Sequence, residues 1–246
     1  MFMTIYGRAF NVLMKKPLKL WAISLLGILL TSVLCALCGV AIPGLALAVA
    51  LLMSTSMTMI YLRGYRGEEV TTTMLFQCFK DWNTIKRVTL GLAWEALWVF
   101  LWSLIPFVGW IFAIIRLYEY RLTPYILVFE PDVAITEAIK VSKQRTYGYK
   151  GQMFLADFVY MIIVGIALGI IGALSGIEAI GPLFALVYAV AYIAYVALAP
   201  LFAGLVQAAF YEEITAKLAN PGFCTGCGQP LAPGAAFCTN CGKPSR

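Results

Sequence analysis

The chain lacks histidine and is poor in charged residues. None of its 246 residues is histidine and only 12% are charged, against about 25% in an average soluble domain. Without histidine it cannot build a Ser-His-Asp or Cys-His catalytic centre, a histidine zinc ligand or a histidine proton relay. Hydrophobic residues make up 62% of the chain, which is more apolar surface than one soluble core of this size can bury. The composition therefore excludes an ordinary soluble enzyme, a disordered regulator and a secreted disulfide scaffold.

Apolar runs long enough to cross a bilayer recur along the chain. A membrane helix needs about 20 mostly apolar residues, and the sequence offers six such runs. Pro106 separates the third run from the fourth, and Pro200 is expected to kink the sixth or to end its membrane part. The predicted fold class is an all-α polytopic membrane protein with about six transmembrane helices, at residues 21–39, 44–62, 88–105, 107–129, 153–175 and 182–210.

Lysine and arginine residues gather on one side of these runs. Of the 18 in the chain, only Arg116 and Arg121 lie inside a run, and the three short turns contain none. The positive-inside rule therefore places both termini and both long connections in the cytoplasm. We expect a multi-pass protein of the bacterial inner membrane. Its net charge of +6 would then face the anionic headgroups of the cytoplasmic leaflet, rather than nucleic acid.

The first apolar run also admits a cleaved signal peptide, because lysines precede it. A second run begins after four residues, however, and Cys35-Ala36-Leu37-Cys38 matches the small-residue pattern of a cleavage site poorly. A first membrane helix is the preferred interpretation. Cys35 and Cys38 have no second cysteine pair near them in the sequence and are expected to be packing residues.

Two segments of the long connections have the period of an amphipathic helix. In residues 69–82 apolar side chains recur every three or four positions, and a second such face begins at Ile135, with Asp132 as the expected N-cap. Both are predicted to be cytoplasmic interfacial helices. The sequence leaves open whether their apolar faces meet lipid or protein.

The most specific motif is a pair of CxxCG segments near the C-terminus. Two residues between the cysteines allow both thiolates to bind one ion, and the glycine that follows can adopt a left-handed turn. Four thiolates leave no open position for water, so the expected cofactor is one structural Zn²⁺. The predicted ligands are Cys224, Cys227, Cys238 and Cys241.

Two disulfides or an iron ion are the alternatives for these cysteines, and a reducing cytoplasm disfavours the disulfides. The segment resembles the small zinc-ribbon modules attached to one end of many bacterial membrane proteins. That resemblance implies a module that docks a protein partner or regulates, and no reaction. The predicted domains are a helical membrane domain at residues 1–219 and a zinc-ribbon domain at 220–246, in which the metal supplies the folding energy.

Five charged residues lie within the predicted spans, where a charge is costly unless it pairs or has a function. Arg116 is expected to pair with Glu119 or Glu95, and Arg121 with Asp157. Such an intramembrane polar network either fixes the register of the helices or lines a substrate path, and the first interpretation is favoured.

Small residues form one face of the fifth run. Gly165, Gly169, Gly172 and Gly176 recur every three or four positions, so another helix can approach closely. That helix is either the sixth run or a second copy of the chain, which would make a homo-oligomer.

The middle of the chain resembles a bacterial family of integral membrane proteins of unknown function. That family is related to the membrane domain of some glycerophosphoryl diester phosphodiesterases. The matching segments are RLTPYIL at 121–127, EPD at 130–132, EAIKVS at 137–142 and FYEE at 210–213. The family often has Ile-Pro-Gly between its third and fourth spans, where this chain has Ile105-Pro106-Phe107. The resemblance implies a helical membrane domain without an established activity, and the catalytic histidines of the phosphodiesterase are missing.

These features together predict a non-enzymatic scaffold, assembly or regulatory component of the membrane, whose zinc ribbon docks a protein partner. The alternative is a transporter or channel component with a polar path lined by residues of spans 3–5. An intramembrane enzyme is less favoured, because the chain has no histidine, no convincing carboxylate dyad and no open metal position.

Overall fold

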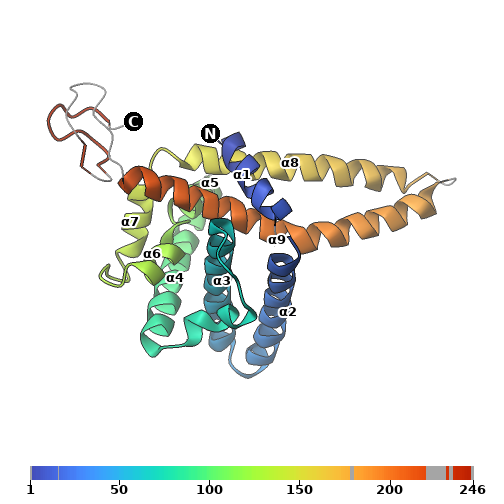
Figure 1. The fold of residues 1–246 in the computed structure, drawn as a ribbon, viewed down its shortest axis with the longest axis horizontal. Coiled ribbons are helices and arrows are strands. Elements are labelled where there is room, and N and C mark those ends of the chain that lie inside the picture. The colour runs from blue at the N-terminus through green and yellow to red at the C-terminus, as the bar shows by residue number, and fades with distance from the viewer. Residues whose placement is uncertain (1, 16, 178–179, 220–230, 233–234, 245–246) are drawn as a thin grey trace.

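The computed structural model describes residues 2–15, 17–177, 180–219, 231–232 and 235–244, and no strand lies within these ranges. The described chain is built from helices (Figure 1). They are α1 (Phe2–Lys15), α2 (Pro17–Ala41), α3 (Pro43–Arg66), the 3₁₀-helix η1 (Thr72–Phe79), α4 (Trp82–Ser103), α5 (Gly109–Glu119), α6 (Thr123–Phe129), α7 (Ala138–Arg145), α8 (Lys150–Leu174) and α9 (Gly181–Ala219).

Two groups of helices run crosswise to each other (Figure 1). Helices α2, α3 and α4 lie side by side, whereas α8 and α9 form a long antiparallel pair that crosses one end of this group. Helix α1 packs across α9 and α8. The largest fully buried side chains lie mainly where α3, α6 and the second half of α9 meet, and they include Ile60, Tyr125, Leu205 and Phe210.

Helices α3 and α9 approach most closely at Gly204. A Cβ atom placed on Gly204 would lie 2.0 Å from Cδ2 of the Tyr61 ring, which is far inside van der Waals contact. The Tyr61 hydroxyl is in turn 2.9 Å from the Ser24 hydroxyl of α2. Because glycine carries only a hydrogen in place of a side chain, the Tyr61 ring can pack directly against the backbone of α9 at Gly204. Gly204 therefore sets the distance between α3 and α9.

Replacing Gly204 with alanine will therefore lower the free energy of unfolding by about 1–3 kcal/mol, as expected for overpacking a buried contact. Thermal unfolding of the purified protein in detergent micelles measures the change. Gly165→Ala on α8 is the matched control, since nothing lies within 4 Å of a Cβ there. Equal melting temperatures for the two variants would contradict the close contact.

The surroundings of α9 change at Pro200. The helix is about 58 Å long at 1.5 Å per residue, nearly twice the hydrocarbon thickness of a bilayer, and it continues through Pro200. The apolar side chains before the proline are exposed, as at Leu183, Leu186 and Ile193, whereas Leu201 and Leu205 after it are buried. Pro200 thus divides an apolar exposed half from a half packed on protein, at the position where the sequence predicts either a kink or the end of the membrane part.

Four of the described helices are long and apolar enough to cross a membrane. They cover Leu18–Val40, Gly44–Arg66, Lys150–Leu174 and Gly181–Leu218, and they contain most or all of the first, second, fifth and sixth predicted runs. The third run lies in α4, whose first turns carry Lys86 and Arg87, and it is not among the four. About six spans are therefore not confirmed.

The prediction of one continuous helix over residues 107–129 is wrong. Helix α5 ends at Glu119 and α6 begins at Thr123, and side chains of α7 and of the residue that follows it replace the hydrogen bonds lost at the break. The Ser142 hydroxyl donates to the Glu119 carbonyl at 2.8 Å and accepts from the Leu122 amide at 3.1 Å. The Thr146 hydroxyl also donates to the Glu119 carbonyl, at 3.1 Å. Buried backbone groups need such partners, and the local apolar pattern gives no sign of them.

The turn between α4 and α5 takes an unusual backbone conformation. Phe107 has a φ of 62°, in the left-handed region that favours glycine. Phe107 is also 97% exposed, so the turn presents a large apolar side chain on a backbone conformation that glycine adopts most readily.

The two predicted interfacial helices differ from expectation. The first is the 3₁₀-helix η1, which packs beside the middle of α3: the Cys78 amide donates to the Ser56 hydroxyl at 3.4 Å, and Leu75 is buried. Its apolar face therefore meets protein rather than lipid. The second, α7, begins only at Ala138, and Asp132 does not cap it because a turn intervenes.

Candidate functional site

A cluster of charged side chains surrounds Glu119 at the end of α5. The Glu119 side chain is only 4% exposed and forms ion pairs with Arg116 and with Lys150, the latter at 2.5 Å. Arg116 also lies 4.6 Å from the centre of the Trp102 ring. Burial opposes ionisation of Glu119, but hydrogen bonds from Lys150 and Arg116 outweigh it and hold the pKa of the carboxyl below its ordinary value. Glu119 thus joins α5 to the first residue of α8.

A second ion pair lies between the α5–α6 break and α8. Arg121 donates to both carboxylate oxygens of Asp157, at 2.6 and 3.3 Å, and the Tyr118 hydroxyl donates to the same carboxylate at 3.1 Å. The paired geometry is the fork arrangement that arginine favours with carboxylates. We call Arg116, Glu119, Arg121, Lys150 and Asp157 the charged cluster.

Glu95 lies apart from these pairs. No ion pair joins it to Arg116 in the described part of the chain, and its Oε2 atom is buried without a hydrogen-bond partner. Of the predicted polar residues, the structure therefore brings Arg116 to Glu119 and Arg121 to Asp157, and leaves Glu95 on α4 outside both pairs.

Sequence reasoning missed three basic residues that hold the helices together. Arg87 donates to the carbonyls of Leu127, Glu130 and Val133, so it caps the end of α6 from α4. Arg145 forms a two-pronged ion pair with Glu130, at 2.5 and 2.7 Å. Lys150 completes the pairing of Glu119. The charge pattern identifies all three only as cytoplasmic cations, and nothing in their local sequence indicates their distant partners.

The second CxxCG motif forms a tight turn. The Cys238 amide donates to the Lys243 carbonyl at 2.8 Å, and the Gly242 amide donates to the Cys238 carbonyl at 2.9 Å. Gly242 has a φ of 68°, which is the left-handed turn expected after the second cysteine. Cys238 is buried, whereas Cys241 is exposed.

This turn fits one half of a zinc-binding knuckle. Two thiols two residues apart on a closed turn are the donor set that Zn²⁺ prefers. The other predicted ligands, Cys224 and Cys227, lie outside the described residues, and within those residues no group of three metal-ligating side chains occurs. A bound zinc would supply folding energy to this segment.

Comparison with known proteins agrees with this motif. A family model described as a zinc-ribbon domain matches residues 223–245. The chain therefore carries a C-terminal zinc-ribbon domain. No curated protein and no solved structure matches the chain. The family comparison supports only this domain, so the resemblance of the helical part to the phosphodiesterase-related membrane family stays a prediction.

Proposed function

We propose that the protein is a non-enzymatic scaffold, assembly or regulatory component of the bacterial inner membrane, whose cytoplasmic zinc ribbon docks a protein partner. The observation that carries the proposal is a zinc-ribbon domain at residues 223–245 attached to helices apolar enough to cross a bilayer. A closed four-thiolate site has no position for a substrate. Small zinc modules of this kind are therefore better suited to presenting a surface than to catalysis.

In the proposed topology α2, α3, α8 and the first half of α9 cross the membrane, and the α4–α5 hairpin enters it only part way. Crossing by all four helices requires the α8–α9 pair to lie more nearly along α2 and α3 in the bilayer than its crosswise position in Figure 1. Helix α5 has 11 residues and is about 16 Å long, too short to cross about 30 Å of hydrocarbon. The apolar side chains at the tip of the α4–α5 hairpin are nevertheless exposed, as at Leu104, Phe107 and Trp110, so they are available to contact lipid. Because the number of full crossings stays even, both termini remain on the cytoplasmic side.

In this proposal the charged cluster has a structural role and holds neighbouring helices together. Its members fix α5 and the α5–α6 break against α8, and each carboxylate in it has a basic partner. A transporter or channel component is the second candidate. It is supported by Glu95, whose buried Oε2 atom has no partner and whose carboxyl such a path would use.

The topology can be tested by labelling each turn. Because the α2–α3 and α8–α9 pairs run crosswise in Figure 1, crossing by one pair does not imply crossing by the other. Each pair is therefore tested separately, with Ile42→Cys in the α2–α3 turn and Ser175→Cys in the α8–α9 turn. A membrane-impermeant maleimide should label both from outside spheroplasts, with sites located by mass spectrometry. Lys140→Cys on the exposed face of α7 is the matched control and should react only after permeabilisation. External labelling at position 140 would contradict the cytoplasmic orientation, and protection of position 175 would exclude crossing by α8 and α9.

A further inference from the structure

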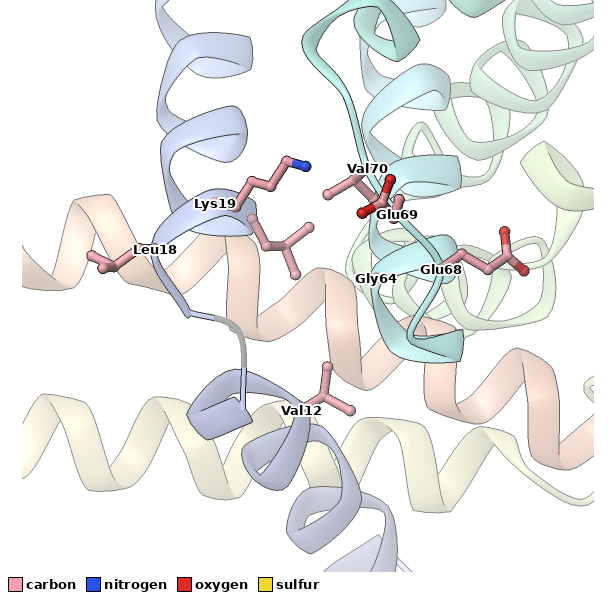
Figure 2. Close-up of a pocket in the computed structure, with 8 residues that line it drawn as sticks. Val12, Leu18, Lys19, Gly64, Glu68, Glu69 and Val70 are labelled. Carbon is pink, nitrogen blue, oxygen red and sulfur yellow. The ribbon is translucent and has the colours of Figure 1, made fainter.

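A pocket of about 440 Å³ opens where the end of α1, the start of α2 and the end of α3 meet. Figure 2 shows its lining. Val12, Leu18, Leu20 and Val70 supply apolar walls, and the charged side chains come from opposite sides of the opening. Lys19 extends from α2 towards the segment that carries Glu69, whose carboxylate faces the same opening (Figure 2).

These charges are available to a ligand. Lys19 and Glu69 are exposed, and neither forms an ion pair in the part of the chain that the structure describes. The neighbouring Glu68 is different, since it lies 4.0 Å from Arg63 and 3.9 Å from Arg66. The pocket therefore offers one unused cation and one unused carboxylate, separated by an apolar opening.

The helix ends reinforce this separation of charge. Helix α2 begins at Pro17, so its partial positive charge lies on the Lys19 side, whereas α3 ends at Arg66, so its partial negative charge lies near Glu69. A ligand that fits must carry a negative group and a positive group a few ångströms apart. A simple anion would meet Glu69, and a simple cation would meet Lys19.

The pocket lies at one end of two candidate membrane helices, Leu18–Val40 and Gly44–Arg66. If these helices cross the bilayer as in the proposed function, on which this inference rests, the pocket is at headgroup level on the cytoplasmic side. Leu18, 75% exposed at the pocket edge, would then contact acyl chains. We propose that the pocket binds the headgroup of a phosphatidylethanolamine lipid, with its phosphate at Lys19 and its ammonium group at Glu69.

The experiment is native mass spectrometry of the full chain in detergent with equimolar phosphatidylethanolamine and phosphatidylglycerol of identical acyl chains. The native protein should retain one phosphatidylethanolamine with about tenfold preference, the effect of one charge-assisted hydrogen bond. Glu69→Gln should bring the preference close to one, because the group that distinguishes the ammonium is lost. Lys19→Gln should lower retention of both lipids about tenfold. Glu137→Gln and Lys140→Gln, on the exposed face of α7, are the matched controls and should change neither value.

Equal binding of the two lipids by the native protein, or an unchanged preference in Glu69→Gln, overturns the lipid site. Carbonate washing of the membranes from which the native chain is purified separates this failure from a failure of the proposed function. If the native chain stays in the washed membranes but shows no preference, only the lipid site is wrong. If carbonate releases the native chain, the membrane topology is wrong and the lipid site fails with it.

Discussion

Replacing Glu119 with alanine will lower the free energy of unfolding by about 3–5 kcal/mol, the range found when one partner of a buried ion pair is removed. The Glu119 side chain is 4% exposed and is shared by Arg116 and Lys150. Its loss leaves two positive charges close together, without a counter-ion and partly buried. Thermal unfolding of the purified protein in detergent, together with the yield of folded protein from membranes, measures the effect.

Glu137→Ala is the matched control for this change. The Glu137 side chain is 58% exposed and lies 4.0 Å from Lys140, so its removal should alter stability by no more than about 0.5 kcal/mol. The two variants remove the same chemical group at opposite extremes of burial. A Glu119→Ala variant that is as stable as the native chain but has lost a growth or transport function would instead favour the transporter candidate.

The same carboxylate gives stability a dependence on pH. Because the folded protein holds the pKa of Glu119 below its ordinary value, the folded state binds fewer protons than the unfolded state in the acidic range. Its contribution is fully present above the ordinary pKa of a glutamate and is lost as the pH falls through the lowered pKa. In the Glu119→Ala variant this part of the acid dependence should be missing.

Local features of the chain were predictable from the sequence. The helical class follows from apolar runs, and the left-handed Gly242 follows from the CxxCG motif, since both depend on residues a few positions apart. The close pairing of Arg116 with Glu119, three residues on, belongs to the same group. In each case the partner lies within one or two helical turns, so the spacing in the sequence carries the geometry.

The features that sequence reasoning missed depend on distant partners. The break between α5 and α6 is stabilised by Ser142, some 20 residues further along the chain. Arg87 reaches carbonyls at the end of α6, more than 40 residues further along. Gly204 is required at its position only because the Tyr61 ring of another helix packs against it. An apolar pattern indicates that one face of a helix is buried, but it does not identify the residues that pack against that face.

Replacing Cys238 and Cys241 with serine will reduce the zinc content of the purified chain to nearly none, against the one ion per chain that we expect for the native protein. A structural zinc supplies about 10–16 kcal/mol of folding energy, and residues 223–245 are too few to build a core without it. The ribbon should therefore become sensitive to limited proteolysis, while the melting temperature of the helical part stays unchanged. Metal analysis by mass spectrometry and peptide mapping after brief protease treatment measure the two effects.

Cys35→Ser with Cys38→Ser is the matched control, because it removes another CxxC motif, with the same spacing, from α2. The Cys35 thiol there lies 3.6 Å from the Ala46 carbonyl, on the next helix, as expected of a packing residue. The control should retain its zinc. Zinc that survives loss of Cys238 and Cys241 would overturn the ribbon site, and zinc lost with Cys35 and Cys38 would place the ion elsewhere.

Cross-linking in intact membranes, with the Cys238/Cys241 variant and the Cys35/Cys38 control, tests whether the ribbon docks a protein partner. A protein that is cross-linked to the native chain and to the α2 control, but is lost when Cys238 and Cys241 are replaced, would be the partner that the folded ribbon docks. The reason is that only the ribbon variant loses the metal that holds the docking surface together. If every cross-linked protein persists in the ribbon variant, the ribbon docks none of them.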